Sequence, residues 1–141
     1  MRAYFFVNMY LSSIQNGLQS AHCISEMFVK YCNLVCNETS ILLEWANNNK
    51  TIIILNGGYS ENLQSIIQLL DTPSNLYPWA TFNEGFDALN GALTCVGIIL
   101  PHHIYESCES LRRKDEIQSS VPLSYWELTM ATELSKYQLA H

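Results

Sequence analysis

Charged side chains are scarce in this sequence. Asp, Glu, Lys and Arg together make up 14% of the 141 residues, roughly half of the usual share. Only 7 residues are Lys or Arg against 13 Asp or Glu, so the formal net charge is −6. A protein that grips long nucleic acid by its phosphates needs a broad basic surface, and this composition excludes one. A small phosphorylated ligand needs only one local basic cluster, which the composition still allows.

The shortage of charge leaves a surface that Asn, Gln, Ser and Tyr must cover, or that another subunit must bury. Uncharged surface rich in aromatic side chains is typical of protein interfaces. We therefore expect a homodimer or a higher homo-oligomer.

Long apolar runs are also missing from the sequence. None approaches the ~20 residues that a membrane-spanning helix needs. The stretch 1–10 is apolar but has no small-residue cleavage site, and we interpret it as a buried strand rather than a signal peptide. We expect a soluble protein of the cytoplasm.

The sequence also lacks cysteines and histidines at the spacings that are typical of metal sites. The five cysteines are odd in number and are not grouped in pairs: Cys23, Cys32, Cys36, Cys95 and Cys108. Cys32 and Cys36 alone do not supply a ligand set. His102 and His103 are adjacent and, on an extended segment, would point in opposite directions. We expect reduced structural thiols, no metal and no cofactor.

What the sequence does contain is enough apolar material for a core. Hydrophobic residues make up 48% and aromatic residues 11% of the chain, which suits one compact domain over residues 1–141. Short apolar runs predict strands at 3–10, 51–55, 79–82 and 92–100. Helical periodicity and caps predict helices at 13–36, 41–46, 60–71, 104–114 and 124–139. The pattern indicates a single-domain α/β fold, a small mixed four-stranded sheet flanked by helices.

The first long helix carries an apolar row and a polar row. Apolar residues recurring at helical steps predict its core-facing stripe: Ile14, Leu18, Ala21, Phe28, Tyr31 and Val35. Gln15, Gln19 and His22 follow one another at steps of four and three, so they share another part of the helix surface. Three interpretations of this polar row are open at this point: the remains of a catalytic site, a site of ligand recognition or subunit contact, or a solvated face.

Three local motifs follow the order of the predicted elements. They are Gln19-Ser-Ala-His22 in the first helix, LLEWANNNKTIIIL over 42–55, and Asn83-Glu84-Gly85 with the strand that runs to Pro101. Together they resemble the type-2 peptidyl-tRNA hydrolases, over roughly residues 3–115. That family has a Gln-x-x-His helix, a Trp before its second strand, and an Asp-Ala-Gly segment followed by a Thr-bearing strand and a proline. The resemblance implies the same α/β fold.

Two departures from that family bear on activity. The lysine that the family uses in catalysis corresponds to Gln15, and the aspartate of Asp-Ala-Gly corresponds to Asn83. The first change removes a positive charge that stabilises a transition state, and the second removes a basic or orienting carboxylate. We expect that the chain is not an enzyme. The alternative is a type-2 peptidyl-tRNA hydrolase-like enzyme that works through His22.

The chain as a whole shows a second resemblance. It is short, rich in Asn and Ile and poor in charge, with a YFFVNMY strand followed by the Gln- and His-bearing helix. In this it resembles the phage Thoeris anti-defence sponge proteins, which sequester cyclic ADP-ribose signals made by bacterial TIR-domain enzymes without degrading them. That resemblance implies a homo-oligomeric sponge in the cytoplasm of an infected bacterial host. Cyclic oligonucleotides are further candidate ligands.

The residues that suit such a ligand are of three kinds. Phe82 can stack on adenine, Asn83 and Asn90 can pair with base edges or ribose hydroxyls, and Arg112 and Arg113 can hold a pyrophosphate bidentately. The polar row completes the candidate ligand-binding set: Gln15, Gln19 and His22.

Each of these residues also has a structural interpretation. Phe82 fits a core position on a strand, and Arg112 and Arg113 fit the solvated, salt-bridged end of a helix. A third hypothesis is an interaction domain that binds no small ligand, for which the low-charge surface is the main support.

Overall fold

A mixed four-stranded sheet forms the centre of the protein. The computed structural model describes residues 1–141, with the side chains of all but residues 88 and 89. The strands are arranged in the order β2-β1-β4-β3, and their bounds are β1 Arg2–Val7, β2 Ile52–Asn56, β3 Trp79–Asn83 and β4 Leu93–Leu100. β1 is parallel to β2, and β4 is antiparallel to both β1 and β3. The predicted α/β class with a small mixed sheet is confirmed.

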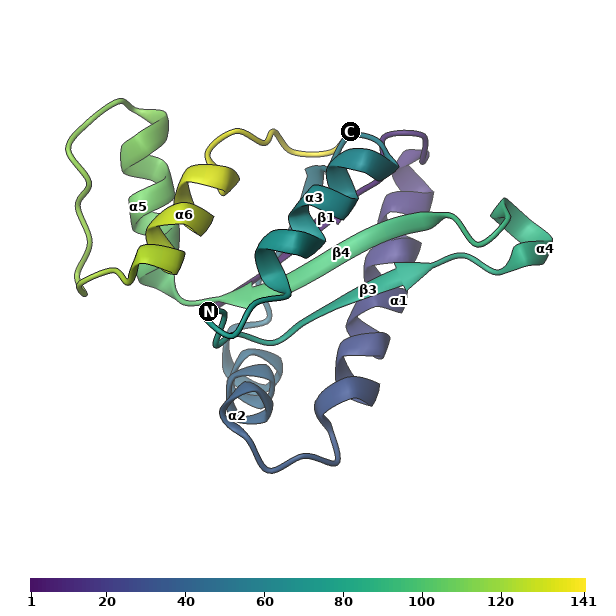
Figure 1. Cartoon of the computed structure of the whole chain (residues 1–141), viewed down its shortest axis with the longest axis horizontal. Coiled ribbons are helices and arrows are strands. Elements are labelled where there is room, and N and C mark those ends of the chain that lie inside the picture. Colours follow the sequence, from purple (N-terminus) through teal and green to yellow (C-terminus); the bar gives the residue numbers. More distant parts are fainter.

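Helices cover both faces of this sheet (Figure 1). On one face lie α1 (Ser13–Tyr31), α2 (Asn37–Glu44) and the π-helical turn η1 (Trp45–Asn49). On the other face lie α3 (Ser60–Leu70), α5 (His102–Arg112) and α6 (Tyr125–Leu134). The short α4 (Phe86–Leu89) lies at the tip of the β3–β4 connection, at the opposite end of the molecule from α5 (Figure 1).

The two central strands are buried on both faces, as strands between two helical layers must be. In β1, Phe5 packs towards α1 and Phe6 packs towards α3, and both are fully buried. All eight residues of β4 are buried. The core is therefore two apolar clusters separated by the sheet.

The turn from β2 into α3 depends on two glycines. A Cβ atom at Gly57 would lie 2.6 Å from Leu63 Cδ2 and 3.0 Å from Phe6 Cβ, and Gly58 has a φ of +75°. At Gly57 there is no space for a side chain. At Gly58 any other residue would have to adopt an unfavourable positive φ. The close packing of α3 on the sheet requires this turn.

The predicted core-facing stripe of α1 is wrong at several positions. Ile14 is 79% exposed and Leu18 is 54% exposed, and Ala21 and Val35 are exposed as well. Phe28 is half-buried and Tyr31 is buried as expected. The buried face consists instead of mostly small and polar residues: Asn16, Gln19, Ser20, Cys23, Met27 and Tyr31. Small side chains let α1 approach the sheet closely, and the inward polar groups find partners there.

Several element boundaries also differ from expectation. The first strand ends at Val7 rather than at residue 10, and the first helix ends at Tyr31 rather than at residue 36. The second helix begins at Asn37 rather than at residue 41, and the last helix ends at Leu134 rather than at residue 139. The segment that follows α6 runs beside β2 instead. The Asn56 N–H donates to the Gln138 carbonyl at 2.9 Å, and the Ala140 N–H donates to the Ile54 carbonyl at 3.0 Å.

Among the described residues, no helix is both long enough and apolar enough to cross a bilayer. The five cysteines are free thiols, of which Cys23, Cys95 and Cys108 are buried and Cys32 is exposed. His102 and His103 belong to α5 rather than to an extended segment.

Candidate functional site

The carboxyl ends of β1 and β2 meet the amino-terminal ends of α1 and α3. Each of these parallel strands leads into one helix, directly for β1 into α1 and through the glycine turn for β2 into α3. In open α/β sheets, ligands bind outside the carboxyl ends of the strands. This edge is therefore where a site is expected, and it is where polar side chains gather.

Gln19 is the centre of this polar cluster. Its side chain is nearly buried, with 6% exposed. The Thr94 hydroxyl donates to Gln19 Oε1 at 2.8 Å, and Gln19 Nε2 donates to Glu84 Oε2 at 2.9 Å. The carboxylate can only accept, so it fixes the orientation of the amide group. Three elements, α1, β4 and the end of β3, are tied together by one hydrogen-bonded chain.

A β-bulge brings Thr94 into the cluster. Phe82 lies opposite Cys95, but the next residue, Asn83, lies opposite Leu93, so Thr94 is an extra residue in β4. Leu93 packs with the α3-side cluster, whereas Cys95 packs with the α1-side cluster. Bulges re-aim side chains in this way and are frequent next to functional sites.

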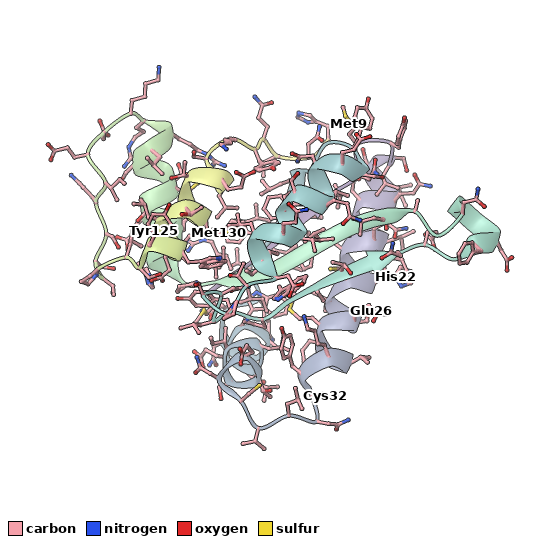
Figure 2. All side chains as sticks on the ribbon, in the orientation of Figure 1. Met9, His22, Glu26, Cys32, Tyr125 and Met130 are labelled. Atoms are coloured by element: carbon pink, nitrogen blue, oxygen red, sulfur yellow. The ribbon has the colours of Figure 1, made fainter. Side chains whose placement is uncertain are left out.

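His22 and Phe82 form a stacked pair beside this cluster. Their ring centroids are 4.5 Å apart and the rings are within 11° of parallel. His22 lies on the exposed surface of α1 (Figure 2), and Phe82 is half-buried on β3. One face of Phe82 is therefore covered, and the outer face of the imidazole is the one open to a flat ligand.

Gln15 and the two candidate asparagines have local structural roles. Gln15 Oε1 accepts from the Ser12 N–H at 2.9 Å, and the Ser12 hydroxyl accepts from the Gln15 N–H at 3.3 Å, a capping box that begins α1. Asn83 is exposed and its Nδ2 donates to the Gly91 carbonyl at 3.1 Å. Asn90 ends α4 with a φ of 55°. Gln15 lies one turn before Gln19 in α1, Asn83 precedes the Glu84 that bonds Gln19, and Asn90 precedes the Gly91 that bonds Asn83.

Arg112 and Arg113 lie elsewhere, at the end of α5 and away from α4 (Figure 1). Arg112 forms an ion pair with Glu109 at 2.9 Å, and Arg113 pairs with Asp115 at 3.2 Å. Within one chain, the structure does not bring these arginines together with the other six candidate residues.

Sequence reasoning did not assign roles to Glu84, Thr94, Asn8 or Asn16. Asn8 Nδ2 donates to the Leu93 carbonyl at 3.2 Å, and Asn16 Nδ2 donates to the His141 carbonyl at 3.4 Å. Asn16 Oδ1 is buried without a partner. A cavity of about 190 Å³ lies here, lined in part by Asn8, Asn16 and Asn56. The available signal was that Asn8 is a polar residue inside the otherwise apolar run that predicts the first strand.

The cluster offers hydrogen-bonding groups and one charge to a ligand. Of the described side chains that form it, Glu84 alone carries a charge. Within the described contacts, none joins His22 to a hydroxyl, thiol or carboxylate that it could activate as a nucleophile. Amide, hydroxyl and carboxylate groups of this kind pair with ligand hydroxyls and base edges.

No protein-family model matches the chain, and no curated protein shows significant sequence similarity to it.

Proposed function

We propose that this chain is a non-enzymatic binding protein that sequesters a cyclic ADP-ribose isomer. The observation that carries the proposal is the Thr94–Gln19–Glu84 hydrogen-bonded chain beside the His22–Phe82 stack. The biological role proposed with it is that of a phage anti-defence sponge that blocks TIR-based Thoeris signalling in the cytoplasm of the infected bacterium.

Two parts of such a ligand suit the residues of one chain. The adenine would stack on the outer face of His22, an interaction worth ~1–3 kcal/mol by analogy with other base-stacking sites. The ribose hydroxyls would pair with Glu84 and with the amides near the cavity. Asn16 Oδ1, buried without a partner, offers one more acceptor there.

The pyrophosphate requires positive charge that the cluster itself lacks. We propose that a second copy of the chain supplies it through Arg113, which is exposed at the end of α5. Support for association comes from the exposed aliphatic residues Ile14, Leu18 and Val29 on α1. The proposal is therefore of a homodimer or a higher homo-oligomer with a shared site.

A capture-and-release assay tests this function. The purified protein is mixed with cyclic ADP-ribose isomers and cyclic oligonucleotides, free ligand is removed by filtration, and the protein is heat-denatured. Mass spectrometry then identifies what is released. We expect one ligand to leave the filtrate and to return chemically unchanged.

Variants connect the captured ligand to the site. His22→Ala and Arg113→Glu should each lower capture at least about tenfold, while Tyr125→Ala, at an 87% exposed residue of α6, should leave capture unchanged. Retention of no ligand from the set, or normal capture by His22→Ala, would contradict the proposal.

The second candidate is a type-2 peptidyl-tRNA hydrolase-like enzyme. The observation in its favour is that Gln19, Glu84 and Thr94, which come from two of the segments that resemble that family, are joined by hydrogen bonds. Release of the acyl-amino acid from a peptidyl-tRNA, lost in both His22→Ala and Glu84→Gln, would support this enzyme over the sponge. A ligand that returns altered from the capture assay would do the same.

A further inference from the structure

A second cavity, of about 210 Å³, lies between the sheet and α5. Tyr4 of β1 and Leu55 of β2 line it on the sheet side, Tyr105 and Cys108 line it on the α5 side, and Tyr137 lines it from the segment after α6. A water molecule takes up about 30 Å³ of liquid, so this space is large enough for a small organic ring. None of these residues belongs to the candidate site described above.

Tyr4 is the unusual residue in this cavity. Its side chain is only 4% exposed, and its hydroxyl is buried without a hydrogen-bond partner. The other tyrosines of the interior are satisfied: Tyr31 donates to the Trp79 carbonyl, Tyr77 to Glu127 and Tyr137 to Glu133. A buried hydroxyl without a partner loses the hydrogen bonds that it makes in water, and a bound acceptor would restore one of them.

The Tyr4 hydroxyl is a neutral donor. Burial raises the pKa of Tyr4 well above its ordinary value, so the phenol keeps its proton. Tyr4 is itself one of the residues that line the cavity.

The remaining walls suit an uncharged ligand. Arg112 is the cation that lines the cavity, but its guanidinium pairs with Glu109 at 2.9 Å and donates to the carbonyls of Leu134 at 3.2 Å and Tyr137 at 3.0 Å. Its charge is neutralised, and it serves as a fixed part of the wall. Tyrosine rings and aliphatic side chains make up most of the rest, which favours a flat apolar molecule.

We propose that this cavity binds a neutral heteroaromatic molecule of one or two rings that accepts a hydrogen bond from the Tyr4 hydroxyl. The site is separate from the Gln19 cluster and does not depend on the function proposed for that cluster.

Two small probes of equal shape test the proposal on the full chain at pH 8. They are 4-methylpyridine, whose ring nitrogen accepts a hydrogen bond, and toluene, which cannot accept one. Each is titrated into ¹⁵N-labelled protein while amide shifts are recorded. We expect shifts in β1, β2, α5 and residues 137–139, with 4-methylpyridine binding about fivefold more tightly than toluene.

Two variants separate this role from a purely structural one. Tyr4→Phe should abolish the preference for 4-methylpyridine and should raise the melting temperature of the free protein, because it removes an unpaired buried hydroxyl. Tyr137→Phe, which loses bonds to Glu133 and Asn62, should lower the melting temperature and keep the preference. Shifts elsewhere, no shifts at all, or an unchanged preference in Tyr4→Phe would overturn the proposal.

Discussion

At the scale of single residues, Gln19 shows how a polar side chain can be part of a core. The amide oxygen accepts from Thr94 and the amide nitrogen donates to Glu84, so each polar atom of the buried side chain has a hydrogen-bond partner. A buried glutamine without partners would be strongly destabilising. The residue is both a structural link and the centre of the candidate site.

Replacement of Gln19 by Leu keeps the approximate size of the side chain and removes both bonds. We expect the free energy of unfolding to fall by ~1–3 kcal/mol, because Glu84 loses a donor and Thr94 keeps only the longer bond to the Phe82 carbonyl, at 3.3 Å. Urea denaturation measures this. The control is Gln64→Leu at an exposed position of α3, which should change stability by less than about 0.5 kcal/mol. Equal effects of the two substitutions would contradict the role given to Gln19.

Gly97 is a second residue whose role is steric. A Cβ atom there would lie 2.7 Å from Phe5 Cε1 and 3.0 Å from the Cys23 sulfur, on the face of the sheet that α1 covers. Gly97→Ala should therefore destabilise the protein by ~1–3 kcal/mol through overpacking. Gly17→Ala, in α1 with nothing within 4 Å of the added atom, should instead stabilise it by ~0.5–1 kcal/mol. Thermal unfolding of the two variants compares these opposite signs.

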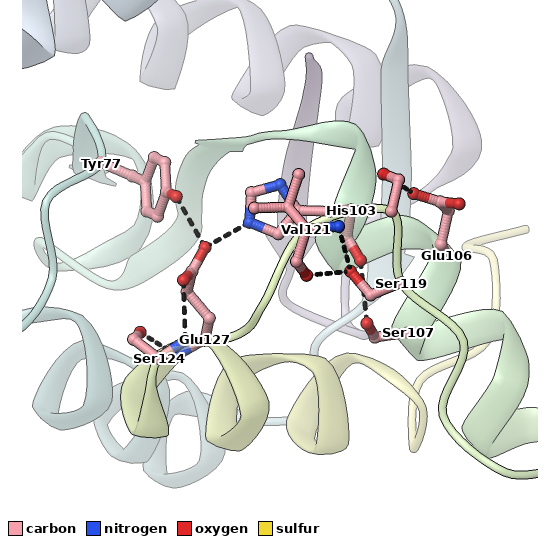
Figure 3. A network of polar contacts seen from close by, with 9 residues as sticks. Tyr77, His103, Glu106, Ser107, Ser119, Val121, Ser124 and Glu127 are labelled. Atoms are coloured by element: carbon pink, nitrogen blue, oxygen red, sulfur yellow. Dashed lines mark hydrogen bonds and ion pairs between the residues drawn. The ribbon is translucent and has the colours of Figure 1, made fainter.

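At the scale of elements, Glu127 joins α6 to α5 and to the chain before β3 (Figure 3). Its Oε2 accepts from the Tyr77 hydroxyl at 2.8 Å and contacts the His103 ring, while its Oε1 accepts from the Ser124 N–H at 3.0 Å. Ser124 and Glu127 together form the capping box that begins α6. One carboxylate thus holds the start of a helix and its two neighbours.

The Glu127 network predicts a pH dependence. Burial alone would raise the pKa of Glu127, but hydrogen bonds from Ser124, His103 and Tyr77 outweigh it and lower the pKa below its usual 4.5. Because the folded-state pKa is depressed, the stabilisation is present in full above pH 4.5 and is lost as the pH falls through the folded-state value. Glu127→Gln should lower the free energy of unfolding at pH 7 by ~1–3 kcal/mol.

Denaturation curves between pH 3 and pH 7 measure this difference. The gap between the natural protein and Glu127→Gln should narrow as the pH falls below about 4.5. Glu61→Gln, at an exposed position in the first turn of α3, should show a much smaller gap at every pH. A Glu127→Gln gap that does not change with pH would show that the carboxylate charge is not responsible.

At the scale of the whole molecule, the outward face of α1 is the feature to explain. Ile14, Leu18 and Val29 are exposed on the longest helix of a chain whose surface has little charge. Exposed aliphatic groups on one helix are typical of a subunit interface. The pattern that suggested a core-facing stripe at Ile14 and Leu18 is real, but in one chain it faces outward.

This face predicts the oligomeric state. Light scattering after size-exclusion chromatography should give the mass of a dimer or a larger oligomer for the natural protein. Leu18→Glu should give a monomer with an unchanged circular dichroism spectrum, because its side chain is 54% exposed and makes little contribution to the core. Leu76→Glu, at a 60% exposed position outside α1, should keep the oligomer. A monomeric natural protein would contradict the prediction.

The sequence by itself determined the α/β class, the four strands and most helices, because apolar runs and periodicity act locally. It did not determine which surface of α1 faces the sheet, since both surfaces repeat with the same period and only close packing against β3 and β4 selects the smaller side chains. It did not show that Glu84, rather than Asn83, contacts Gln19. The bulge at Thr94 sets the direction of the side chains at this end of β3, and a bulge arises only when the strands pair. Nor did the sequence separate Arg112 from the other candidates, since the distance between α5 and the β3–β4 end is a property of the assembled sheet. Local patterns fix elements, whereas pairing register and layer packing fix which side chains meet.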